Sequence, residues 1–129
     1  MGEMARYGVI AAINPANLYF EGDSFVRNIG PERMARHTPY KSFLDAGIVM
    51  ASGSDYPNNS PDPWIGIYQM VTRKHQISGE VHGAEQRISL HQALKTFTLN
   101  GAYLTFDDDI RGSLEPVSSP ISSSSMPIS

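Results

Sequence analysis

The chain has 129 residues, of which 40% are hydrophobic and 18% charged, so it can bury the core of one globular domain and is not a disordered chain. Its net charge of −3 argues against nucleic acids and anionic membranes as partners, because both favour a basic surface. The absence of cysteine excludes disulfides, thiolate metal sites and a cysteine nucleophile, and the lack of a secretory signal or a membrane-spanning apolar run predicts a cytoplasmic protein.

Two short apolar runs predict the strands of a parallel sheet. The first run, 9–13, ends at Asn14 and Pro15, where the proline blocks further strand pairing. The second run, 48–51, follows Gly47, a residue suited to the left-handed conformation that closes a helix. Because neither run alternates with polar residues, both strands are expected to be buried on both faces.

Helices are predicted wherever a capping residue precedes apolar residues at helical spacing. The capping box of Ser89 and Gln92 opens one long amphipathic helix that reaches Leu104. Asp62 and Pro63 start another helix as its N-cap and first position. Trp64, Ile67, Tyr68 and Val71 give the Pro63 helix an apolar face. A further helix is predicted from Pro31, with a bend or restart at Pro39, and residues 1–7 are predicted to be the end of a helix. Loops are predicted over 17–23 and 76–87.

One carboxylate, Asp55, stands just past the second predicted strand. A turn of small residues, 52–54, separates it from the strand. In α/β proteins such positions line the functional site, whereas strand interiors mostly pack, so Asp55 is a candidate catalytic acid or base. An aspartate in such a turn can also cap the turn through its own backbone, and the local sequence alone favours this second interpretation.

The element order predicts an α/β domain over 1–115. Two parallel strands with helices between them form one βαβ unit, whose open edges need further strands. A complete (β/α)8 barrel takes about 250 residues. The order therefore predicts either a small three-layer domain or part of a barrel. From Pro116 the composition changes to Ser and Pro, so 116–129 is predicted to be a disordered low-complexity tail.

Several motifs together resemble one enzyme family. The segment 40–57, YKSFLDAGIVMASGSDYP, and the segment 61–67, PDPWIGI, resemble the C-terminal part of the amidohydrolase superfamily. They are most similar to amidohydrolase family 3, which includes enzymes like N-substituted formamide deformylase. The helix ISLHQALKTFTLNGA at 88–102 and the turn GSLEP at 112–116 resemble the segments that follow in that family. The resemblance implies a partial (β/α)8 TIM barrel, made of its last two strands and its C-terminal helices.

The resemblance also implies a chemistry. In the family, the aspartate that matches Asp55 contacts a divalent metal, with zinc the foremost candidate. It takes a proton from the metal-bound water and passes it to the leaving nitrogen. The implied substrate is a small-molecule amide whose carbon–nitrogen bond is not a peptide bond. Asn14 and Tyr56, beside the strand ends, are candidate substrate-binding residues, although packing or backbone capping explains them equally well.

The chain departs from the family pattern in its metal ligands. The family's His-x-His motif and middle-strand ligands are absent, and His37, His75, His82 and His91 follow no such motif, so we expect these histidines in loops or on helix surfaces. A catalytic zinc needs about three protein ligands. We therefore expect a fragment that binds no metal and is inactive alone. The alternative is a non-catalytic remnant or binding module that associates with a partner or with itself through open strand edges.

Overall fold

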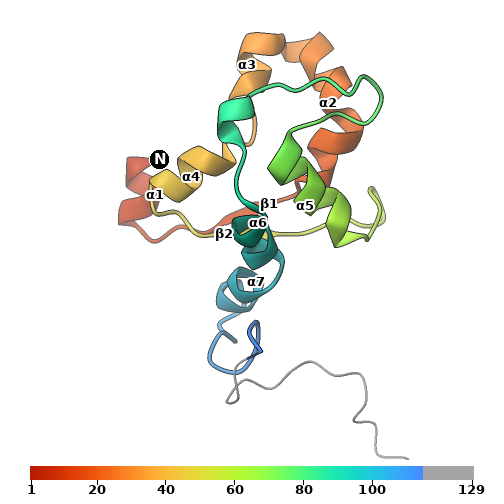
Figure 1. Ribbon diagram of the computed structural model, residues 1–129. Coiled ribbons are helices and arrows are strands. Elements are labelled where there is room, and N and C mark those ends of the chain that lie inside the picture. Colours follow the sequence, from red (N-terminus) through yellow and green to blue (C-terminus); the bar gives the residue numbers. More distant parts are fainter. Residues whose placement is uncertain (115–129) are drawn as a thin grey trace, which may run out of the picture.

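The computed structural model describes residues 1–114, which place a two-stranded parallel sheet among short helices (Figure 1). Strand β1 (Ala11–Ile13) pairs with β2 (Met50–Ser52), and Ala12 lies opposite Ala51. The predicted division of the chain at 115, and the predicted tail, lie outside the described residues. The helices, in chain order, are α1 (Gly2–Arg6), α2 (Ala16–Ile29), α3 (Pro31–Ala35), α4 (Tyr40–Asp45), α5 (Pro63–Thr72), the 3-10 turn η1 (Ala84–Gln86), α6 (Leu90–Phe97) and α7 (Leu99–Leu104).

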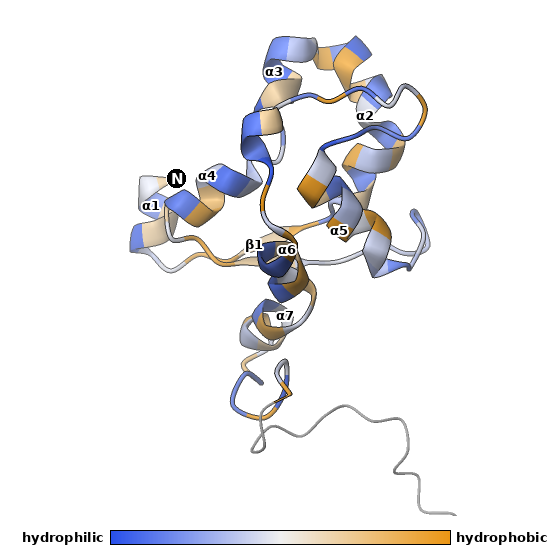
Figure 2. Ribbon diagram, viewed as in Figure 1, coloured by the Kyte–Doolittle hydropathy of each residue, from blue (hydrophilic) through white to orange (hydrophobic). Residues whose placement is uncertain are grey.

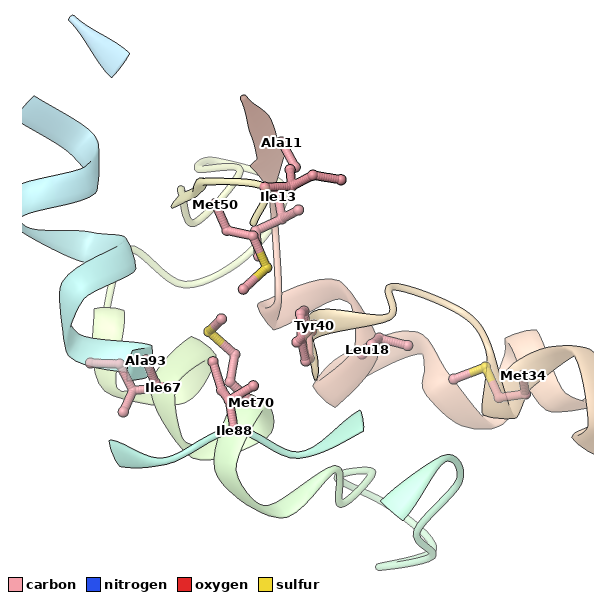
Figure 3. Close-up of a cluster of buried hydrophobic side chains, with 11 residues drawn as sticks. Ala11, Ile13, Leu18, Met34, Tyr40, Met50, Ile67, Met70, Ile88 and Ala93 are labelled. Atoms are coloured by element: carbon pink, nitrogen blue, oxygen red, sulfur yellow. The ribbon is translucent and has the colours of Figure 1, made fainter. Parts of the chain in front are cut away.

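The hydrophobic core lies between the sheet and the helices that surround it (Figure 3). In Figure 2 the strands are mostly apolar, whereas α2 and α3 mix hydrophilic and hydrophobic residues. Both strands supply core side chains, and α2, α4, α5 and α6 close over them. The buried core residues are Ala11, Ile13, Leu18, Met34, Tyr40, Ile48, Met50, Ile67, Met70, Ile88 and Ala93.

The strands confirm the predicted parallel pairing but correct the prediction of their burial. Met50 and Ala51 of β2 are buried, whereas in β1 Ala12 is exposed between the buried Ala11 and Ile13. Within the described residues β1 pairs with β2 alone, and the exposure of Ala12 shows that its side of β1 is not covered. Each strand is also shorter than predicted, with three residues.

The predicted loop over 17–23 is wrong, because these residues belong to the 14-residue helix α2. Gly22 and Asp23 have low helix propensity, but tertiary contacts outweigh it. Leu18 and Gly22, four positions apart, are both buried, and Gly22 lies against the ring of His75 so closely that an added Cβ would come within 2.5 Å of it. The interior therefore requires a helix where the local sequence favours a loop.

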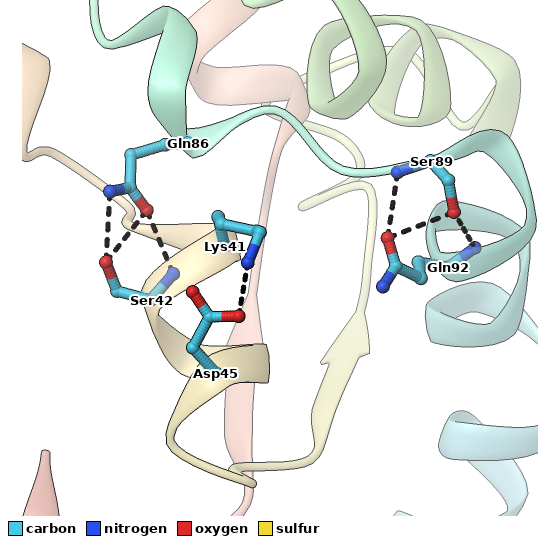
Figure 4. A network of polar contacts seen from close by, with 6 residues as sticks. All are labelled: Lys41, Ser42, Asp45, Gln86, Ser89 and Gln92. Carbon is cyan, nitrogen blue, oxygen red and sulfur yellow. Dashed lines mark hydrogen bonds and ion pairs between the residues drawn. The ribbon is translucent and has the colours of Figure 1, made fainter.

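The predicted N-caps are confirmed, but two helical predictions need correction. Asp62 accepts a hydrogen bond from the backbone N–H of Trp64 at 2.9 Å, and the capping box of Ser89 and Gln92 is complete (Figure 4). The predicted apolar face of α5 is rotated, since Trp64 is 62% exposed. The residues of α5 that are buried are Gly66, Ile67, Gln69 and Met70.

The single long helix predicted from Leu90 to Leu104 is two helices, α6 and α7. The chain breaks at Thr98, whose φ of −126° and ψ of −97° are not helical. After the break, the side chain of Asn100 donates a hydrogen bond to the carbonyl of Met50 at 2.8 Å. The change in direction thus allows α7 to bind the backbone of β2 instead of continuing past it.

Polar contacts hold the outer elements together. Gln86 of η1 accepts hydrogen bonds from the backbone N–H and the hydroxyl of Ser42 in α4, both at 3.1 Å (Figure 4). Lys41 and Asp45 form an ion pair one turn apart on the same helix. Within residues 1–114, no helix has both the length and the apolar character needed to cross a membrane.

Candidate functional site at the carboxyl ends of the strands

The carboxyl ends of β1 and β2 meet at one edge of the sheet. The backbone N–H of Gly53 donates to the carbonyl of Ile13 at 2.9 Å, so the pairing extends one residue past β2. An added Cβ on Gly53 would lie 3.3 Å from Oδ1 of Asn14. The structure therefore brings Asn14 beside the loop that carries Asp55, here called the β2–α5 loop (53–62).

Asp55 turns the chain within this loop. Its φ of 63° is in the left-handed region, which for an aspartate stores on the order of 1 kcal/mol of strain. Its carbonyl accepts hydrogen bonds from the backbone N–H groups of Asn58, at 2.8 Å, and Asn59, at 3.3 Å. Oδ2 of the exposed carboxylate accepts from the side-chain amide of Asn58 at 3.3 Å, whereas Oδ1 has no partner within residues 1–114. Asp55 therefore combines a turn-stabilising backbone with a carboxylate that stays open on one oxygen.

Two asparagines attach the β2–α5 loop to the start of α2. Asn59 is 8% exposed, and its side-chain amide donates to Oδ1 of Asn17 in the first turn of α2. Tyr56, by contrast, is 68% exposed, and its backbone N–H donates to the hydroxyl of Ser54 at 3.2 Å. The loop is thus anchored at Asn59, while the ring of Tyr56 stays on the surface.

A cavity of about 320 Å³ lies at the carboxyl end of β1. Its polar lining includes Asn14, Asn17 and His37, so one predicted substrate-binding residue borders it. The ring of His37 stacks on Phe25 with 5.0 Å between centroids, and its Nδ1 lies 2.9 Å from the hydroxyl oxygen of Thr38. Burial, together with the nearby charge of Arg73, lowers the pKa of His37. The sequence predicts His37 in a loop or on a helix surface and gives no sign of this cavity.

Arg73 holds one wall of the cavity from below the surface. It is 1% exposed, and its guanidinium donates to the carbonyls of His37 at 3.0 Å, Thr38 at 3.0 Å and His82 at 3.1 Å. Its charge also lies over the ring of Tyr40, 5.3 Å from the centroid. Burial lowers the pKa of Arg73 and raises that of the Tyr40 hydroxyl. No local sequence signal predicts this role, because the segment 37–38 lies far from Arg73 in the chain.

The other histidines form no cluster with Asp55. His75, predicted in a loop or on a helix surface, lies in a loop but is 2% exposed, and its Nδ1 is 3.1 Å from Oδ1 of Asp23. His82 lies beside it, 5.2 Å between ring centroids, and His91 is exposed on α6. Across residues 1–114, no group of three or more His, Cys, Asp or Glu side chains is placed to hold a metal ion.

The comparisons with known proteins identify related sequences. Residues 1–117 match the sequence model of a protein family described as the amidohydrolase family. The chain is 29% identical over 112 residues to the amidohydrolase YtcJ of Bacillus subtilis, covering 85% of this chain and 21% of that protein. It is 26% identical over 115 residues to the N-substituted formamide deformylase of Arthrobacter pascens, covering 87% and 21%. The chain thus spans about a fifth of the length of these curated relatives.

A solved structure shares the fold described above. An uncharacterized metal-dependent hydrolase from Pyrococcus horikoshii superposes with a TM-score of 0.72 at 24% identity, covering 88% of this chain and 23% of that chain. A second hydrolase of the same description, from Pyrococcus furiosus, gives a TM-score of 0.66. The arrangement of these strands and helices is therefore one that known proteins adopt within longer chains.

Proposed function

The chain belongs to the amidohydrolase family, and on this premise we propose that it supplies part of a site that hydrolyses a carbon–nitrogen bond in a small-molecule amide. The observation that carries the proposal is the position of Asp55. It follows the carboxyl end of β2, in a loop whose first residue, Gly53, is hydrogen-bonded to the end of the parallel neighbour β1. In an α/β barrel, such loops form the active-site face.

Asp55 would act as the proton-transferring group of this reaction. Amide hydrolysis adds a water oxygen to the carbonyl carbon and moves a proton to the departing nitrogen. A carboxylate can carry that proton if it is oriented and open to the reactants. The hydrogen bond from Asn58 to Oδ2 orients Asp55, and Oδ1 remains free for a water or a substrate. Asn14, which lies against Gly53, and Tyr56, which follows Asp55 in the chain, are proposed substrate contacts.

The described residues do not fit a catalytic metal on their own. The Pyrococcus relatives are titled metal-dependent hydrolases, and a catalytic zinc takes about three protein ligands. Residues 1–114 offer no group of three ligating side chains, and within them Asp55 forms no hydrogen bond or ion pair with a histidine. We therefore propose that a divalent metal, zinc foremost, requires ligands from outside the described residues. The chain by itself is then expected to bind no zinc and to hydrolyse no amide.

A chimera tests the role of Asp55. Residues 1–117 of this chain would replace the matching segment of the Arthrobacter N-substituted formamide deformylase, and hydrolysis of N-benzylformamide would be followed with zinc present. We expect the chimera to be active and Asp55→Asn to lower kcat by at least a hundredfold, the scale of a lost general base. Asp108→Asn, at an exposed position of the same charge, is the control. Equal activity of the two variants would disprove the proposed role.

One observation favours a second candidate function, binding through the open sheet. Ala12 and Val9 are exposed apolar residues on or next to β1, and within residues 1–114 each strand has one partner. Unpaired strand edges associate readily with other chains. On this reading the chain is a non-catalytic module, and sedimentation should show self-association that Val9→Lys reduces. A clean monomer up to about 100 μM would rule it out, since edge-driven aggregation acts at μM to mM concentrations.

A further inference from the structure

We propose that a hollow between the neighbouring helices α2 and α5 binds a small quaternary ammonium compound, of the choline type, from solution (Figure 1). This hollow, here called the aromatic hollow, is lined by Tyr19, Asp62, Trp64, Ile65 and Tyr68. The inference is independent of the proposed function, because neither Asp55 nor Asn14 is among these lining residues. Three features support it: the arrangement of the rings, the single carboxylate and the size of the hollow.

Three aromatic side chains from two helices surround the aromatic hollow. Tyr19 lies in the first turn of α2, and Trp64 and Tyr68 lie one turn apart on the same face of α5. The ring planes of Tyr19 and Tyr68 stand at 86° to each other, with 5.9 Å between centroids, so the two rings form a corner. Trp64 is 62% exposed and Tyr68 is 45% exposed, so a ligand can reach them from solvent. Aromatic side chains gathered around an open hollow attract a cation to their ring faces.

One carboxylate gives the aromatic hollow its charge. Oδ1 of Asp62 accepts a hydrogen bond from the backbone N–H of Trp64 at 2.9 Å, whereas Oδ2 has no partner within residues 1–114. No Lys, Arg or His is among the described residues that line the hollow. The amino end of α5 opposes a cation with a partial charge of about +0.5, which the full negative charge of Asp62 outweighs. The aromatic hollow is therefore complementary to a positive ligand.

The lining favours a methylated ammonium over a primary one. A primary ammonium has three N–H donors that need acceptors, and Asp62 is the one carboxylate of the lining. A quaternary ammonium has no N–H donor, and its methyl groups pack directly on aromatic rings. The hollow has a volume of about 220 Å³. Pockets for drug-sized ligands start at about 300 Å³, so this volume suits a compact trimethylammonium group.

Fluorescence of the full chain tests the inference directly, because Trp64 is the only tryptophan in the sequence. Choline chloride would replace sodium chloride at constant ionic strength, since salt screens exposed charges. We expect a saturable change with a Kd on the order of 1 mM, because each exposed cation–π contact is weak. The compound 3,3-dimethylbutan-1-ol has the shape of choline without its charge, and it should bind roughly tenfold more weakly. The absence of saturation, or equal affinities for the two compounds, would overturn the inference.

A matched pair of aspartates tests the contribution of charge. Asp62→Asn removes the carboxylate but keeps the helix cap, because asparagine is an equally good N-cap residue. We expect it to weaken choline binding about fivefold, the effect of one ion pair in a solvated site. Asp108→Asn removes the same charge at an exposed position outside the lining and should leave the affinity unchanged. Equal affinities of the two variants would contradict a cation site at Asp62.

A matched pair of tyrosines tests the contribution of the rings. Tyr68 and Tyr103 are 45% and 46% exposed, and Tyr103 lies on α7 outside the lining. We expect Tyr68→Leu to weaken choline binding about two- to fivefold and Tyr103→Leu to have no effect. Equal effects of these substitutions would overturn the inference, as would binding to phosphatidylcholine vesicles without binding of free choline. Because these measurements need no turnover, the Asp55 chimera can fail while the aromatic hollow still binds choline, and the reverse.

Discussion

Replacing Arg73 by methionine should destabilise the fold strongly, because a buried guanidinium holds two segments together. Arg73→Met removes the donor to three carbonyls. The carbonyl of Thr38 keeps a second donor, the backbone N–H of Tyr40 at 3.0 Å, whereas no other hydrogen bond supports those of His37 and His82 within residues 1–114. Two partly buried acceptors left unpaired cost about 1–3 kcal/mol each at most. Methionine restores some packing and removes a buried charge, so we expect a net loss of about 3 kcal/mol.

Urea unfolding followed by circular dichroism measures this loss, since the exposed Trp64 is a poor reporter of the core. Arg27→Met is the matched control. Arg27 is exposed on α2 and donates to the hydroxyl of Ser24 at 2.9 Å, so its replacement should change stability by less than about 0.5 kcal/mol. NMR titration should also show the pKa of His37 rising toward its ordinary 6.5 in Arg73→Met, because a neighbouring positive charge is lost. A loss below about 1 kcal/mol would refute the reasoning.

Two further substitutions probe the packing of α2 against the loop after α5. Gly22→Ala places a Cβ within 2.5 Å of the His75 ring and should cost about 1–3 kcal/mol in urea unfolding, while Gly101→Ala, with open space around it, should be neutral or stabilising. The pKa of Asp23 is lowered from its ordinary 3.8, chiefly by a hydrogen bond from Ser78. The ionised carboxylate therefore stabilises the folded chain fully at a pH well above 3.8, and this contribution is lost as the pH falls through the lowered pKa. The stability gap between the unmodified chain and Asp23→Asn should therefore narrow from pH 6 to pH 3, and a gap that is constant with pH would contradict this linkage.

The sequence predicts features that depend on neighbouring residues and misses those that depend on distant ones. The caps at Asp62 and Ser89 and the end of α4 before Gly47 are encoded within a few residues, and the structure has them. Helix α2 is missed because contacts with His75, more than fifty residues away, outweigh the low propensity of Gly22 and Asp23.

The candidate site likewise combines features set by neighbouring residues with features that depend on residues far apart in the chain. The position of Asp55 past a strand follows from the local order of elements, and parallel pairing then brings it to the end of β1. The cavity needs β1, α2 and the segment before α4 to be in place together, with Arg73 holding that segment. No motif spans those elements, so His37 has no recognisable pattern in the sequence. Its environment is visible in three dimensions alone.

Asn17 links helix α2 to the β2–α5 loop that carries Asp55. Its side-chain oxygen accepts a hydrogen bond from the side-chain amide of Asn59, whose backbone N–H in turn donates to the carbonyl of Asp55. Its side-chain nitrogen has no partner within residues 1–114. Because one planar amide carries both groups, rotating it to suit a ligand would break the bond that anchors the β2–α5 loop. The orientation of Asn17 is therefore fixed by its hydrogen bond to the β2–α5 loop.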